Sequence, residues 1–172
     1  SGLLPDLRAW RELAARGVQK CSIVIVDLDR FSAINDAHGR GIGDSVLGAA
    51  ATRFARLLRP FDKVYRYGAD EFLIALPGAD LSMAQAVIKR VREAFASQPL
   101  WSGPGGIELT VTASFGLASL DPEVGAEESV ERAEQALLLA KTAGGNRAIS
   151  WDPSVTTGVR LPRLQLDDIK SQ

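Results

Sequence analysis

The chain has 172 residues, of which 46% are hydrophobic and 24% charged, enough for one globular domain with a full apolar core. Its 20 basic and 21 acidic residues leave a net charge of -1, so composition gives no overall electrostatic footprint for nucleic acid or an anionic membrane. The single cysteine, Cys21, excludes an intrachain disulfide. No apolar run reaches about 18 residues, so we expect no membrane-spanning helix and a cytoplasmic location.

Helical and strand periodicities alternate along the sequence. They predict, in chain order, a helix over residues 5–16, a strand over 21–28, a helix over 43–58, a hairpin of strands 63–67 and 71–76, a helix over 81–96, a loop over 98–106, a strand over 107–119, a helix over 127–143 and a strand over 147–151. This order predicts an α/β (α+β) fold, in which a central mixed sheet carries helices on its faces.

The expected domain covers residues 1–151, because the periodicity fades after that point. Residues 152–172 are predicted to be a C-terminal tail or a linker. The sequence begins at Ser1 without a methionine, so we expect it to be a piece of a larger protein.

Two acidic pairs mark the candidate site. Asp27 and Asp29 lie where a nearly uninterrupted apolar run ends, and Asp70-Glu71 follows the glycine of the predicted hairpin turn. Buried carboxylates are costly, whereas hard divalent ions prefer oxygen ligands. If the hairpin lies beside the first strand, both pairs meet at one edge of the sheet and resemble a site for phosphoryl or nucleotidyl transfer. The alternative is that they are unrelated acids in surface turns.

Asn35 and Asp44 have a suitable pair of functional groups for guanine recognition. The Asn35 amide both donates and accepts hydrogen bonds, and the Asp44 carboxylate accepts them. The alternative is structural, with Asn35 at the start of a turn and Asp44 as the cap of the following helix.

Several motifs in this order resemble the GGDEF family. The resemblance extends from about residue 2 to residue 149 and is carried by Asp27 to Asp36, Gly39, Gly43-Asp44, Val46-Leu47, Arg66 to Phe72, Thr112 to Gly116, Ala136-Leu137 and Ala140-Lys141. It implies a mostly antiparallel sheet similar to the nucleotidyl cyclase and polymerase palm. It also implies condensation of two GTP molecules into cyclic di-GMP by a homodimer, usually fused to sensory or output domains.

The resemblance also implies roles for individual residues. Asp27, the backbone carbonyl of Leu28 and Asp70 would hold Mg²⁺ or Mn²⁺, and Glu71 would help to deprotonate the attacking hydroxyl. The substrate-binding residues implied by the same motifs are Phe31, Asn35, Asp44, Gly68, Ala69 and Lys141. An Arg-x-x-Asp motif, Arg59 to Asp62, would bind cyclic di-GMP as an inhibitor, with Arg90 completing that site. The alternative for this motif is a surface turn with an incidental ion pair.

Among the departures of the chain from the family pattern, three argue against full activity. Ala69 replaces the second signature glycine, so a positive φ there would cost about 1 kcal/mol. Ser32 and Gly145 replace basic residues that would face the triphosphate. These departures keep a second hypothesis open, in which an inactive domain senses cyclic di-GMP or GTP and regulates an attached domain.

Overall fold

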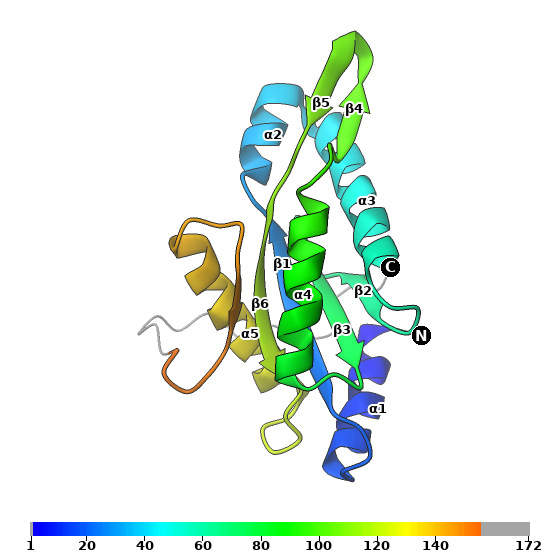
Figure 1. Cartoon of the computed structure of the whole chain (residues 1–172), viewed down its shortest axis with the longest axis vertical. Coiled ribbons are helices and arrows are strands. Elements are labelled where there is room, and N and C mark those ends of the chain that lie inside the picture. Colours follow the sequence, from blue (N-terminus) through cyan, green and yellow to red (C-terminus); the bar gives the residue numbers. More distant parts are fainter. Residues whose placement is uncertain (1, 156–172) are drawn as a thin grey trace.

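The computed structural model describes residues 2–155, which form an α+β fold with a five-stranded sheet and helices on both faces (Figure 1). The elements are α1 (Leu3–Ala15), β1 (Cys21–Leu28), α2 (Phe31–His38), α3 (Arg40–Leu57), β2 (Lys63–Arg66), β3 (Glu71–Pro77), α4 (Leu81–Phe95), β4 (Trp101–Gly103), η1 (Pro104–Gly106), β5 (Ile107–Leu109), β6 (Ala113–Ser119), α5 (Ala126–Thr142) and β7 (Ala148–Ser150). The strand order is β2-β3-β1-β6-β7, and only β6 and β7 pair in parallel. The predicted mixed, mostly antiparallel sheet is therefore confirmed.

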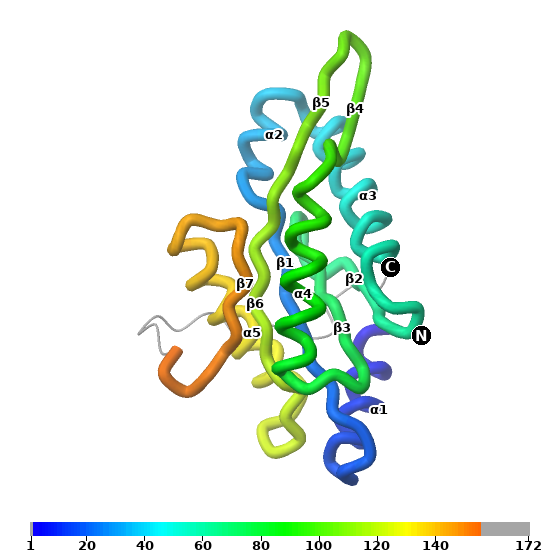
Figure 2. Tube along the Cα trace, viewed as in Figure 1, coloured from blue at the N-terminus to red at the C-terminus, as the bar shows by residue number. Residues whose placement is uncertain are grey.

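The central strand, β1, is buried along its whole length. Val24 and Val26 pack in a core with α3 and α4, whereas Ile23 and Ile25 pack in a second core with α1 and α5. In Figure 2, α4 crosses in front of the sheet. Because successive strand residues face opposite sides, a strand covered on both faces needs the uninterrupted apolar run found in the sequence.

Residues 31–38 form a separate helix, α2, which the apolar pattern did not distinguish. Gly39, with φ 88°, is the residue at which α2 ends and α3 begins. The helix α3 therefore starts at Arg40 and not at residue 43. Glycine adopts this left-handed backbone without the steric cost of a side chain. The turn folds α2 back against α3.

The prediction of a loop over 98–106 and one strand over 107–119 was wrong. β4 and β5 pair as a two-stranded hairpin, and β6 begins only at Ala113. Gly105 and Gly106, with φ of 78° and 76°, make the tight connection. The Thr112 carbonyl instead accepts a hydrogen bond from the Asp29 N–H at 2.9 Å, at the end of β1. The hairpin extends beyond the sheet at one end of the molecule (Figure 1).

The last strand, β7, ends at Ser150. Most of the predicted tail, residues 156–172, lies outside the described residues. None of the helices within residues 2–155 is both long and apolar enough to cross a bilayer.

Candidate active site

The two acidic pairs lie at the same end of the sheet. The antiparallel pairing of β1 and β3 places Asp27 directly opposite Glu71, and the pairing of β1 with β6 places Asp27 opposite Ser114. Asp70 immediately precedes β3, and its negative charge acts on both Asp27 and Glu71. The sheet thus gathers carboxylates from segments more than 40 residues apart in the sequence.

Asp27 is the most buried member of this cluster, with 6% of its surface exposed. Its Oδ2 accepts a hydrogen bond from Nζ of Lys141 on α5, whereas its Oδ1 is buried without a partner in the described part of the chain. Burial raises the pKa of Asp27, the Lys141 hydrogen bond opposes this rise, and Asp70 adds to it. A buried carboxylate oxygen without a donor is costly, and a cation would satisfy it.

These oxygens fit a divalent cation that is only partly coordinated by protein. Mg²⁺ commonly takes one or two carboxylates and completes its shell with water and substrate phosphates. Within residues 2–155, no group of three or more His, Cys, Asp or Glu side chains is arranged to hold a metal ion by itself. The predicted set of Asp27, the Leu28 carbonyl and Asp70 uses only two carboxylates, so it leaves positions open for a substrate.

A further carboxylate, Glu134 of α5, faces the cluster and was not predicted. Burial raises the pKa of Glu71 to about 8, and Glu134 is the strongest of the negative charges that add to this rise. Burial raises the pKa of Glu134 itself to about 7. The Tyr67 hydroxyl and Glu134 Oε1 are buried, and neither has a hydrogen-bond partner among the described residues. The two side chains are still close enough to interact, because Glu134 raises the pKa of Tyr67 and Tyr67 lowers the pKa of Glu134.

The sequence did contain a signal for Glu134. It lies between Val130 and Leu137 on the face of α5 that packs against the sheet. An ionisable residue within such an apolar stripe is a candidate for a functional site.

The turn between α2 and α3 brings together the two residues predicted to recognise guanine. A Cβ atom at Gly43 would lie 1.8 Å from Asn35 Oδ1 and 3.4 Å from the Phe31 ring, so both side chains lie against this glycine. Asp44 follows on the exposed surface of α3. Asn35 lies within α2 and Asp44 within α3, so neither the turn nor the helix-cap interpretation is correct.

The signature hairpin does not strain Ala69. Among the described residues other than glycine, only Arg30 and Asn146 have positive φ. The Ala69 carbonyl accepts a hydrogen bond from Arg66 Nη2 at 3.0 Å. The preceding Gly68 lies close to Glu71, because a Cβ at Gly68 would lie 3.4 Å from Glu71 Oε2. The condition for left-handed strain at Ala69, a positive φ, is therefore not met.

The loop after α5 is attached to the end of β1 through Asp29. The Asp29 carboxylate accepts hydrogen bonds from Thr112 Oγ1 at 2.6 Å, Ser114 Oγ at 2.7 Å and the Asn146 N–H at 2.8 Å. Gly145 has φ 76°, and a Cβ there would lie 3.0 Å from Asp29 Oδ1. This close approach explains a glycine at a position where the family pattern has a basic residue. Ser32 is exposed on α2.

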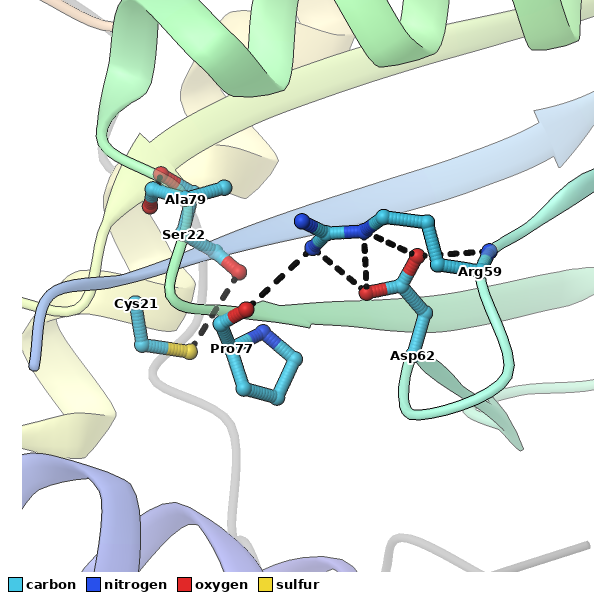
Figure 3. Close-up of polar contacts among 6 residues, drawn as sticks. All are labelled: Cys21, Ser22, Arg59, Asp62, Pro77 and Ala79. Carbon is cyan, nitrogen blue, oxygen red and sulfur yellow. Dashed lines mark hydrogen bonds and ion pairs between the residues drawn. The ribbon is translucent and has the colours of Figure 1, made fainter.

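The Arg-x-x-Asp motif forms a compact ion pair (Figure 3). Arg59 Nε lies 2.8 Å from Asp62 Oδ2, Arg59 Nη2 lies 2.6 Å from Oδ1, and the Arg59 N–H donates to Oδ2 at 2.8 Å. Arg59 Nη2 also donates to the Pro77 carbonyl at 3.2 Å. The guanidinium lies 4.6 Å from the ring centre of Phe61, which is largely exposed.

Arg59 and Asp62 line a surface pocket of about 410 Å³ together with residues of α3. Arg90 is exposed on α4 and does not line this pocket. The structure thus brings Arg59 and Asp62 together but not Arg90.

A mixed, mostly antiparallel sheet with carboxylates at the end of its central strand and on the adjoining hairpin defines a palm-like domain of the nucleotidyl cyclase class. A family model described as diguanylate cyclase, GGDEF domain, matches residues 6–147, so the chain belongs to the GGDEF domain family.

Individual relatives agree with this assignment. The chain is 35% identical over 125 residues to diguanylate cyclase DgcP of Pseudomonas aeruginosa, a match that covers 73% of this chain but only 18% of DgcP. The structure of diguanylate cyclase SiaD from Pseudomonas aeruginosa, solved with its activator SiaC, is similar with a TM-score of 0.80 and 33% identity over 86% of this chain and 56% of SiaD. The GGDEF domain of DgcB from Caulobacter crescentus, solved with c-di-GMP, has a TM-score of 0.78 and 27% identity over 85% of this chain and 86% of that domain.

Proposed function

We propose that this domain condenses two GTP molecules into cyclic di-GMP and releases pyrophosphate. The observation that carries the proposal is Asp27 Oδ1, a buried carboxylate oxygen without a partner among the described residues, next to Glu71 and Asp70. Membership of the GGDEF family and similarity to diguanylate cyclases support the same reaction. The retained carboxylates favour a cyclase over a domain that only senses the nucleotide.

Asp27, the Leu28 carbonyl and Asp70 would hold Mg²⁺ or Mn²⁺. Such a cation supplies charge stabilisation to the reacting phosphate and the leaving group. Glu71 lies opposite Asp27, and a cation bound beside it would favour its ionised form, which can accept the proton of a 3′-hydroxyl. Lys141 adds a positive charge on the same side of the sheet, where the triphosphate needs one.

Guanine selectivity would come from Asn35 and Asp44. The Asp44 carboxylate can accept hydrogen bonds from the guanine N1–H and 2-amino groups, which adenine does not offer at that edge. Gly43 lets the Asn35 amide pack against α3 beside Asp44, because a Cβ at residue 43 would lie 1.8 Å from Asn35 Oδ1. The exposed backbone of Gly68 and Ala69 would lie along the phosphates.

The reaction needs two copies of the domain, because each holds one GTP and the 3′-hydroxyl of one attacks the α-phosphate of the other. Alignment of the two nucleotides supplies much of the rate enhancement. We therefore propose a catalytic homodimer, formed in the cytoplasm as part of a longer protein with sensory or output domains.

Arg59 and Asp62 would bind the product as an inhibitor. A guanidinium and a carboxylate together can donate to and accept from a guanine, and an arginine can also pair with a phosphate. The pocket beside them is open, so Arg59 can exchange its contact with Asp62 for the ligand. Arg90 would take part only from a different rotamer or from a second copy of the domain.

The test is turnover of GTP by the purified protein with Mg²⁺ or Mn²⁺, with pyrophosphate and cyclic di-GMP both measured. Asp70→Asn is expected to lower the rate by about 100-fold or more, because it removes a charge that holds the cation at the reacting phosphate. Glu108→Gln, a matched change on the exposed β5 strand, is expected to have no effect. Full turnover by Asp70→Asn would refute the site, and tight product binding without turnover would favour the sensor.

A further inference from the structure

A groove between α4 and β7 gathers positive charge away from the carboxylate cluster. It has a volume of about 630 Å³, and Leu117 of β6 and Ala148 of β7 form part of its lining. Leu117 packs in the core beneath α3 and α4, whereas Lys141, the partner of Asp27, lies on α5 against the other face. The groove is therefore separate from the proposed catalytic site, and it does not include Arg59 or Asp62.

Lys89 and Arg92 of α4 and Arg147 beside β7 contribute the charge. Neither Lys89 nor Arg147 pairs with a carboxylate of the described part of the chain. Arg92 reaches only Glu93, at 3.9 Å, and donates to the Asn146 carbonyl at a long 3.4 Å. By contrast, Arg59, Arg132 and Lys141 each pair with an aspartate.

The other polar groups of the groove suit an anion. Arg147 Nε donates to the Gly145 carbonyl at 3.0 Å, which leaves its terminal nitrogens for a ligand. Gln85 of α4 and Ser150 of β7 also line the groove, and Gln85 Nε2 donates a 2.8 Å hydrogen bond to Ser150 Oγ. Both side chains add neutral hydrogen-bond donors to the lining. The one acid in the lining, Asp152, accepts hydrogen bonds from Ser154 and stays ionised, so the three cations of the lining still outnumber its negative charge.

We propose that this groove binds a polyphosphate group, either inorganic pyrophosphate or the phosphates of a nucleotide. Guanidinium groups recognise phosphate oxygens with paired hydrogen bonds, and an ammonium adds a mobile point charge. Concentration of three cations in one concave site favours a compact, highly charged anion over an extended acidic peptide. This inference goes beyond the proposed cyclase reaction and does not depend on it.

The groove is connected to the carboxylate end of β1 through one residue, Asn146. The Asn146 carbonyl accepts from Arg92, and the Asn146 N–H donates to Asp29, two residues beyond Asp27. A phosphate that draws Arg92 into the groove would therefore act on the loop that holds Asp29.

The experiment is calorimetric titration of the whole chain with pyrophosphate in EDTA, which removes cation-assisted binding at the catalytic site. Lys89→Ala combined with Arg147→Ala is expected to weaken binding by about tenfold or more, because charge-assisted hydrogen bonds are lost. The control pair Arg16→Ala with Lys20→Ala removes the same charge from an exposed region and is expected to change little. Asp70→Asn is expected to bind as the unchanged protein does.

Parallel titrations with inorganic phosphate and GTP in EDTA identify the source of the group. Tighter binding of GTP than of pyrophosphate, lost in the Lys89/Arg147 variant, would assign the site to a nucleotide. The proposal is overturned if pyrophosphate and GTP do not bind in EDTA, if the control pair loses as much affinity, or if a glutamate-rich peptide binds the groove more tightly than either.

Discussion

Asp27 and Glu71 face each other across the pairing of β1 with β3, and Lys141 approaches the same point from α5. The lysine contacts only one oxygen of Asp27, and burial with neighbouring acids raises the pKa of Glu71, because the fully ionised cluster would hold an excess of negative charge. Burial of this excess is unfavourable in the free protein and becomes favourable when a cation and a nucleotide are bound. Substitutions in this cluster and on the surfaces around it should therefore change nucleotide binding and the free energy of unfolding by different amounts, so that the two effects can be measured separately.

Gly43→Ala is expected to weaken GTP binding by about 2- to 10-fold, the value of one neutral hydrogen bond. The new Cβ would occupy the position of Asn35 Oδ1, so the amide must move away from the base. The measurement is the KM for GTP, or the affinity of a non-hydrolysable analogue.

Gly48→Ala on the same helix is the matched control, because a Cβ there meets nothing within 4 Å. Its expected effect is a gain in the free energy of unfolding of up to about 1 kcal/mol, from higher helix propensity, with unchanged nucleotide binding. Equal effects of the two substitutions on GTP affinity would show that Asn35 does not recognise the base.

Ala69→Gly restores the usual signature but is expected to destabilise the fold. Ala69 does not have positive φ, so glycine relieves no strain and only adds freedom to the unfolded chain. The expected loss is about 0.4–1 kcal/mol in the free energy of unfolding. Urea denaturation measures it, and a gain in stability would contradict an unstrained backbone at Ala69.

The stability of the cation-free domain is expected to fall as pH rises from about 5 to 8. Burial raises the pKa of Glu134 to about 7 and that of Glu71 to about 8, from an ordinary 4.5. The folded state therefore holds protons that the unfolded chain releases, which stabilises the fold at low pH and is lost as pH rises through these values.

Glu134→Gln keeps a neutral side chain at all these pH values and removes the negative charge that most raises the pKa of Glu71. It is expected to flatten the dependence of unfolding free energy on pH, measured by urea denaturation in EDTA. A slope as steep as that of the unchanged protein would place the titrating groups elsewhere.

Arg59→Ala is expected to abolish tight binding of cyclic di-GMP. It also leaves the fully buried Asp62 side chain with the residue 59 N–H as its remaining donor, so we expect a stability loss of about 1–3 kcal/mol. Calorimetry with the product is the measurement, and Arg56→Ala on the exposed surface of α3 is the control. Unchanged affinity in the Arg59 variant would refute the inhibitory role.

The sequence by itself determined the central strand, the signature hairpin and the helices that cover the sheet. Their apolar periodicities are local, because a strand buried on both faces must be apolar throughout, as residues 21–28 are. It did not determine α2, whose start lies at the left-handed Arg30 and whose end depends on the positive φ of Gly39. It also failed for the β4–β5 hairpin, where the apolar residues of 107–119 are shared between two sheets.

For the site, the residue types were available from the sequence, but their surroundings were not. The tertiary structure decided that Asp44 lies within α3 and not at its cap, and that Glu134 lies beside Glu71. The pKa values of Glu71 and Glu134, the unpartnered oxygen of Asp27 and the groove of Lys89, Arg92 and Arg147 were decided only by the tertiary structure. Burial and electrostatic interaction depend on which distant segments meet, and periodicity within one segment carries no information about that.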